Sequence, residues 1–148
     1  MVKKRKMTSK KAVQELTDLK RDIFPYLHRD YNEALTIAIE SLEREGKQVR
    51  AERVGERFKE MANRWHDETD HLSSSSRITN NGLYLEIISM GETAIPFILR
   101  DLQERGGDWY PALRILSDAD PVPTEVRGEV PKMKEAWISW GRDKGYIK

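Results

Sequence analysis

Apolar residues recur at intervals of three and four over most of the chain, which is the spacing of one face of an α-helix. The first such segment starts near Ser9, whose hydroxyl can cap a helix, and Pro25 is expected to end or kink it. Its apolar stripe consists of Val13, Leu16, Leu19, Ile23 and Leu27. A second helix is predicted over about 30–45, with Gly46 as its stop, and a third over about 49–72.

The serine run 73–76 interrupts this pattern. Serine buries little apolar surface and competes for backbone hydrogen bonds, so the run predicts a loop and a boundary between two halves of the protein. Short helices with tight joints are predicted after it. Their expected caps and stops are Asn80 or Asn81, Gly91, Thr93, Gly106, Gly107 and Asp108.

Two of the later segments need a closer reading. Residues 83–90 are rich in β-prone side chains, but Leu83, Ile87 and Met90 follow the i, i+4, i+7 spacing that favours a helix. The last helix is predicted to start near Pro131. Tyr146 is expected to fold back on its final turn, because the preceding glycine has the chemistry of a helix end.

Two likenesses to known proteins bear on the fold. The pattern Gly91-x-x-Ala94-Ile95-Pro96-x-Ile98-Leu99-x-x-Leu102, followed by Asp108-Trp109-x-x-Ala112-Leu113-x-x-Leu116, resembles a HEAT-type helical repeat. A wider set of landmarks over residues 58–146, including Trp65-x-x-Glu68-Thr69 and Asp120-Pro121-Val122-Pro123, is similar to that of small bacterial proteins. The second likeness implies a shared fold and carries no activity.

The predicted fold class is therefore all-α, a compact bundle of about seven helices whose C-terminal part is HEAT-repeat-like. Each short helix has one apolar face, so it must stack on its neighbours to bury that face. The expected organisation is a basic tail over 1–11, an N-terminal helical region over 12–72 and a HEAT-like helical region over 77–148.

Charge is unevenly distributed along the chain. Residues 1–53 hold 13 Lys and Arg against 9 Asp and Glu, whereas residues 54–148 hold 13 against 16. The tail contributes Lys3, Lys4, Arg5 and Lys6, which can contact phosphate or an acidic protein. The chain has no cysteine, which fits a reducing compartment. No apolar run is long enough to predict a membrane span, so a cytoplasmic location is expected.

Candidate metal ligands are densest between His66 and His71. His66 with Asp70, and Asp67 with His71, are both i, i+4 pairs, but they point about 100° apart round a helix and do not converge on one ion. We therefore predict no metal, and a solvated helix end at this cluster. The sequence shows no phosphate-binding loop and no nucleophile motif, so no catalytic residue, cofactor or small-molecule substrate is predicted.

Each of the four tryptophans could lie either in the core or in a binding surface. Trp65, Trp109 and Trp137 fall on apolar stripes and are predicted to lie in the core. Trp140 is less determined, since Gly141 leaves room beside it. An exposed tryptophan there would suit a protein interface, because tryptophan is enriched among residues that dominate binding energy.

A nucleic-acid interpretation also fits one segment. Residues 34–58 are similar to the helix-turn-helix rhythm of bacterial regulators, with a turn at Gly46. Acidic side chains at 52 and 56 lie among the basic ones and weaken this interpretation. The candidate DNA contacts on the second helix of this motif are Gln48, Arg50, Arg53 and Arg57.

Two functions are expected from these observations. The first is a non-catalytic helical interaction module that binds another protein in the bacterial cytoplasm, with Trp140 as the candidate contact. The alternative is a DNA-binding regulator or accessory protein that uses the segment 34–58 and the basic tail.

Overall fold

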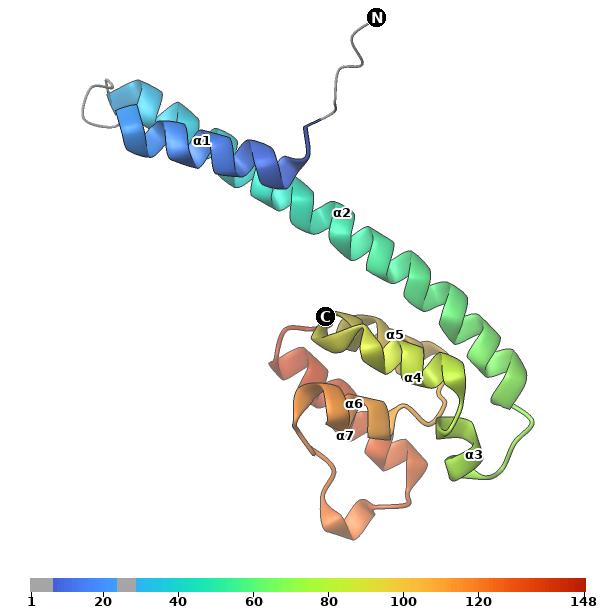
Figure 1. The fold of residues 1–148 in the computed structure, drawn as a ribbon. Coiled ribbons are helices and arrows are strands. Elements are labelled where there is room, and N and C mark those ends of the chain that lie inside the picture. Colours follow the sequence, from blue (N-terminus) through green and yellow to red (C-terminus); the bar gives the residue numbers. More distant parts are fainter. Residues whose placement is uncertain (1–6, 24–28) are drawn as a thin grey trace, which may run out of the picture. The chain divides into compact units, whose positions relative to one another are not determined.

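The computed structural model describes residues 7–23 and 29–148 (Figure 1). Within these ranges the chain forms seven α-helices and no strand, which confirms the all-α prediction. It divides into two compact units, unit 1 (Met1–Glu52) and unit 2 (Arg53–Lys148). The division falls inside a helix, whereas the sequence placed a boundary at the serine run 73–76.

Unit 1 is a pair of helices. α1 (Ser9–Ile23) starts at the predicted residue and runs beside the first part of α2 (Arg29–Thr69) (Figure 1). The two helices are antiparallel, because a Cβ on Gly46 would lie 3.8 Å from Ser9, and the Lys20 ammonium donates to the Thr36 hydroxyl at 2.5 Å. The predicted break at Pro25, the apolar Leu27, and the tail residues Lys3, Lys4, Arg5 and Lys6 lie outside the described residues.

The predicted stop at Gly46 is wrong, because α2, which is 41 residues long, continues through this residue to Thr69. A glycine ends a helix when it adopts a positive φ, and Gly46 does not do so. Its cost inside a helix is about 1 kcal/mol relative to alanine, and its neighbours Arg44, Glu45, Lys47 and Gln48 are good helix formers. The second and third predicted helices are therefore one.

Unit 2 contains the last part of α2 and a set of short helices. These are α3 (Ser75–Thr79), α4 (Gly82–Ser89), the 3₁₀ turn η2 (Gly91–Ala94), α5 (Ile95–Glu104), α6 (Tyr110–Ser117), the 3₁₀ turn η3 (Thr124–Val126) and α7 (Val130–Asp143). The segment 83–90 is helical, as its spacing predicted. Half of the serine run is helical rather than loop, because α3 begins at Ser75.

The caps of these helices were partly predictable. The Asn81 side chain accepts hydrogen bonds from the amides of Leu83 and Tyr84, which is the expected cap of α4. Thr93 and Asp108 do not cap α5 and α6, whose first residues follow Ala94 and Trp109 without a side-chain cap. Asp108 is used elsewhere: its carbonyl accepts the Tyr84 hydroxyl at 2.8 Å, and its carboxylate accepts the Ser75 hydroxyl.

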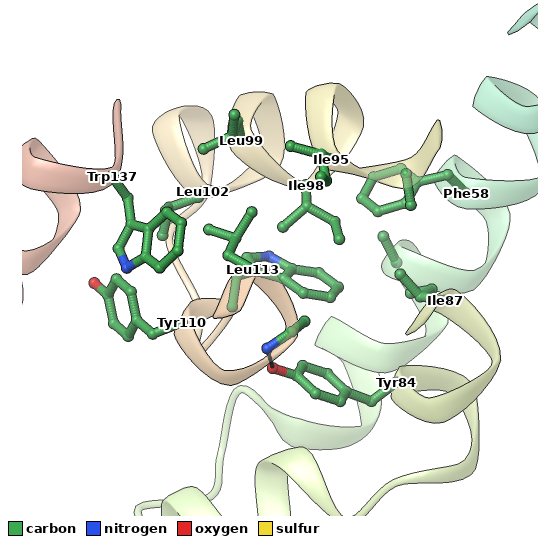
Figure 2. Close-up of a cluster of buried hydrophobic side chains, with 14 of the residues drawn as sticks. Phe58, Tyr84, Ile87, Ile95, Ile98, Leu99, Leu102, Tyr110, Leu113 and Trp137 are labelled. Carbon is green, nitrogen blue, oxygen red and sulfur yellow. Dashed lines mark hydrogen bonds between the residues drawn. The ribbon is translucent and has the colours of Figure 1, made fainter. Parts of the chain in front are cut away.

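The apolar core lies in unit 2 (Figure 2). Trp65, Trp109 and Trp137 are fully buried, as predicted. The Trp109 ring stacks on the Tyr84 ring, with centroids 5.3 Å apart and planes 11° apart, and the Trp65 ring lies 4.1 Å away. Aliphatic side chains of α4, α5 and α6 surround this aromatic centre; they are Ile87, Ile95, Ile98, Leu99, Leu102 and Leu113.

Within the described ranges, no single helix is long and apolar enough to cross a membrane. The segments Gly82–Ser89 and Gly91–Glu104 meet the length and composition criteria together, across a bend of 111°. Most of their apolar side chains belong to the core of unit 2, whereas Leu85 is 55% exposed.

Candidate functional site

The described part of unit 1 has no buried core of its own. Among its described residues none is buried, and the core of the protein begins at Phe58 in unit 2. Apolar side chains nevertheless run along both helices. Leu19 is 47% exposed, Tyr31 68% and Val49 43%. Monomeric proteins rarely leave apolar surface uncovered in a contiguous patch, so this surface is the strongest candidate for an interaction site.

The uncovered surface arises because α1 covers only part of the width of the apolar face of α2. Leu35, Ile39 and Leu42 are half-buried and spaced to face α1. At about 100° per residue, Tyr31, Ala38 and Val49 lie about 50° round α2 from that row. All three are exposed and mark one edge of the helix pair.

α1 contributes to the same edge. Leu19 lies about 50° round α1 from Leu16 and Ile23, which are half-buried. Because the two helices are antiparallel, this rotation places Leu19 on the same side of the helix pair as Tyr31 and Val49. We refer to Leu19, Tyr31, Ala38 and Val49 as the open face.

The other side of the helix pair is polar. A groove of about 510 Å³ runs there between α1 and α2, lined among others by Val13, Gln14, Glu43, Lys47 and Arg50. At about 100° per residue, these residues lie on the opposite side of the half-buried row between the two helices from the open face. Charged side chains thus gather on this side of unit 1, although Val13 also lines the groove and Ile37 is 57% exposed away from the open face.

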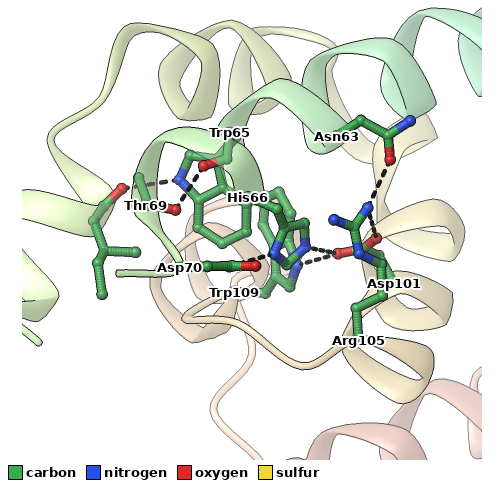
Figure 3. Close-up of polar contacts among 9 residues, drawn as sticks. Asn63, Trp65, His66, Thr69, Asp70, Asp101, Arg105 and Trp109 are labelled. Carbon is green, nitrogen blue, oxygen red and sulfur yellow. Dashed lines mark hydrogen bonds and ion pairs between the residues drawn. The ribbon is translucent and has the colours of Figure 1, made fainter. Parts of the chain in front are cut away.

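Unit 2 holds a buried polar cluster that the sequence did not reveal (Figure 3). The Nε2 atom of His66 lies 2.6 Å from a carboxylate oxygen of Asp101, and its Nδ1 atom lies 3.0 Å from Asp70. The Trp109 indole donates to the same Asp101 oxygen at 2.8 Å. Arg105 donates to Asn63 at 2.6 Å and lies 3.9 Å from Asp101.

The predicted solvated helix end is wrong at His66, whose side chain is 2% exposed. Burial alone would lower the pKa of His66. Hydrogen bonds to Asp101 and Asp70, with the charge of Asp101, outweigh burial and the opposing charge of Arg105, so the pKa is raised above 6.5. Both ring nitrogens face carboxylates, so in the protonated imidazole both donate to them and neither is free to act as a general base.

The same geometry bears on metal binding. Both nitrogens of His66 are engaged by carboxylates, and His71 lies exposed on the surface. Over residues 7–23 and 29–148, no group of three or more His, Asp or Glu side chains gathers in an arrangement that could hold an ion. We expect elemental analysis of protein purified without chelator to find far less than one zinc or iron per chain. A stoichiometric metal would contradict this expectation.

A second concave surface lies between the last part of α2 and α5. It has a volume of about 380 Å³, and Phe58 and Phe97 form its apolar wall. Its basic residues are largely engaged, because Arg105 bonds to Asn63 and the Arg100 guanidinium lies 5.5 Å from the centre of the Phe97 ring. Lys59 and Glu104 also line this surface.

Trp140 is half-buried rather than exposed. Its ring stacks on Tyr146, with centroids 5.4 Å apart, and meets the Trp137 ring edge to face at 5.2 Å. The Tyr146 amide donates to the Gly141 carbonyl at 2.9 Å, which confirms the predicted return of the chain onto the last turn of α7. Trp140 therefore contributes mainly to packing at the C-terminus, with part of its ring open to solvent.

Of the predicted DNA contacts on α2, Arg50, Arg53 and Arg57 follow an i, i+3, i+7 spacing on one side of the helix, whereas Gln48 does not share that side. α2 has no turn at Gly46, so the segment 34–58 lacks the joint that a helix-turn-helix needs. Gln48 and Arg50, two residues apart on one helix, point about 160° away from each other. Gln48 instead donates to Glu52 at 2.9 Å, and Arg57 lies 3.8 Å from Glu86.

A scan against protein-family models finds no match, and searches of curated proteins and of solved structures find none either. The likenesses to HEAT repeats and to small bacterial proteins over 58–146 therefore stay predictions. The candidate site is interpreted from its own geometry.

Proposed function

We propose that the chain is a non-catalytic helical interaction module of the bacterial cytoplasm that binds protein through the open face of unit 1. The observation that carries this proposal is the contrast between the two units. Unit 2 buries a full aromatic and aliphatic core, whereas the described part of unit 1 buries no residue and exposes large apolar side chains. Burial of such side chains favours association, although only the surplus over the lost freedom of the partners appears as affinity.

The polar cluster of unit 2 supports a structural role rather than catalysis. His66 joins α2 to α5 through Asp101, and both of its nitrogens are occupied. Unit 2 then serves as the stable body that carries the binding helices. The partly open ring of Trp140 offers a smaller second contact.

Affinity capture with matched variants tests this function. The full chain is immobilised and exposed to nuclease-treated native lysate, and the captured protein is compared with that of Leu19→Lys and of the control Ile115→Lys. Ile115 is 64% exposed on α6, so its substitution disturbs no packing in unit 2. We expect Leu19→Lys to reduce capture at least several-fold and Ile115→Lys to leave it unchanged.

A DNA-binding assay tests the alternative function, a DNA-binding regulator or accessory protein. Nanomolar binding to a defined duplex at physiological salt, abolished by Arg50→Ala or Arg53→Ala, would show that the module binds DNA instead. A capture that is lost on nuclease treatment would point the same way. Equal capture by Leu19→Lys and by the unchanged chain would contradict the role of the open face.

A further inference from the structure

A small pocket lies in unit 2 among residues of α6, of α7 and of the loop that joins these helices. Its volume is about 180 Å³, and Val122 of the loop and Met133 of α7 form part of its apolar wall. Because its polar groups come from all three segments, no local sequence motif indicated it. We refer to it as the loop pocket.

The buried end of the loop pocket carries a hydrogen-bond donor without an acceptor. The Trp137 side chain has no exposed surface, and its Nε1 atom forms no hydrogen bond with any residue in the described part of the chain. Figure 2 shows this nitrogen turned toward the hydroxyl of Tyr110, which also lines the pocket. Buried N–H groups in proteins nearly always have an acceptor, so this indole indicates a place for a ligand oxygen.

The Tyr110 hydroxyl is a second donor at this end. It donates to the Val130 carbonyl at 3.3 Å, which is longer than an ordinary O–H···O bond of about 2.5–3.0 Å, so a closer acceptor can take its proton. Burial, and then the charge of Asp108, raise the pKa of Tyr110, so the hydroxyl is neutral at physiological pH. The indole and this hydroxyl are therefore two neutral donors.

The solvent-facing end of the loop pocket is positively charged. Arg127 donates to a carboxylate oxygen of Asp120 at 2.7 Å, and a nitrogen of Arg114 lies 3.5 Å from the same oxygen. Two guanidinium groups against one carboxylate leave a net charge of +1. Each guanidinium has five N–H donors, so its contact to Asp120 leaves others available to a second carboxylate.

The two ends suit different parts of one ligand. A carboxylate pairs best with the half-exposed guanidinium groups, because a charge buried against neutral donors alone is costly. The buried end instead suits a neutral carbonyl or hydroxyl oxygen. Since an engineered cavity of about 150 Å³ holds benzene, the loop pocket has room for roughly seven or eight non-hydrogen atoms.

We propose that the loop pocket binds a small oxo or hydroxy carboxylic acid, with its carboxylate at Arg114 and Arg127 and its second oxygen at the Trp137 indole. The carbons between these groups pack against Val122 and Met133. This site goes beyond the proposed function and does not depend on the open face of unit 1, so each of the two can fail without the other.

Titration of the full chain with 4-oxopentanoate tests the site. The chain has four tryptophans, so its proton–nitrogen NMR spectrum contains four indole signals, and sequential assignment identifies that of Trp137. We expect this signal to shift saturably, with a Kd in the millimolar range or below, as the number of atoms in the ligand allows. The absence of a saturable shift at this indole would overturn the site.

Two matched ligands separate the two ends of the pocket. Pentanoate lacks the second oxygen, and pentan-2-one lacks the carboxylate. The unchanged protein should bind pentanoate about fivefold and pentan-2-one about tenfold more weakly than 4-oxopentanoate. Trp137→Phe should remove the preference over pentanoate and keep that over pentan-2-one. Equal binding of 4-oxopentanoate and pentanoate by the unchanged protein would show that the indole does not hold the second oxygen.

Arg127→Ala should have the opposite effect. We expect it to weaken 4-oxopentanoate roughly tenfold and to leave pentan-2-one unchanged. The Arg127 side chain is 50% exposed, so the variant should stay folded. The matched control Arg57→Ala removes an exposed arginine of α2 outside the pocket and should bind as the unchanged chain does. Equal weakening in both variants would contradict a specific site, and tighter binding of inorganic phosphate than of 4-oxopentanoate would contradict the ligand class.

Discussion

Trp109→Ala is expected to lower the free energy of unfolding of unit 2 by about 3–5 kcal/mol, the range for truncation of a fully buried tryptophan. Trp109 has no exposed surface, stacks on Tyr84 and lies beside Trp65. Its removal also deprives Asp101 of a hydrogen-bond donor at 2.8 Å. The loss therefore combines a large cavity with a weakened polar cluster.

Urea denaturation followed by tryptophan fluorescence measures this effect. All four tryptophans of the chain lie in unit 2, so the signal reports that unit alone. Trp109→Phe keeps most of the apolar volume but loses the indole donor, and should cost less, about 1–3 kcal/mol. Ile115→Ala, at an exposed site, should stay within about 0.5 kcal/mol. If Trp109→Ala lowered the free energy of unfolding by only about 0.5 kcal/mol, the aromatic centre would not be the core.

Stability should depend on pH through His66. The pKa of His66 is raised in the folded protein above its ordinary 6.5, because the hydrogen bonds to Asp101 and Asp70 outweigh burial. The folded state thus binds this proton more tightly than the unfolded chain does. Its contribution is fully present below pH 6.5, the ordinary value, and is lost as the pH rises through the raised pKa.

His66→Gln tests this contribution. Breaking a buried charged pair costs about 3–5 kcal/mol, and we expect this loss below the ordinary pKa of histidine, with a smaller loss at alkaline pH. Asp101→Asn removes the closest negative charge and should lower the imidazole pKa in an NMR titration. An imidazole pKa below 6.5 in the unchanged protein would contradict the proposed geometry, as would an identical pH dependence of stability in His66→Gln.

Local chemistry made much of the helical architecture predictable. The cap at Asn81 and the burial of Trp65, Trp109 and Trp137 follow from spacing and from a side chain that acts on its own backbone. α1 starts at Ser9 as predicted, but the hydroxyl that accepts from its first turn, the Lys11 amide at 3.4 Å, is that of Thr8. Gly46 was misread because a glycine can end a helix or merely weaken it, and strong helix formers on both sides decide between the two.

The polar cluster could not be predicted in the same way. His66 and Asp101 are 35 residues apart, and no local pattern indicates that they meet. One signal did exist: His66 follows Ala62 by one helical turn, so it continues a buried face rather than a solvated one. The open face was visible as apolar residues, but its exposure depends on how much of α2 a single short helix can cover.

Hydrogen exchange tests the central claim most directly, since it reports the stability of each unit separately. If the open face of unit 1 is the protein-binding surface, amides of α1 and of residues 29–52 should exchange more slowly when the captured protein is added, while those of α5 and α6 stay constant. Exchange in unit 1 that is unchanged by that protein would contradict the claim.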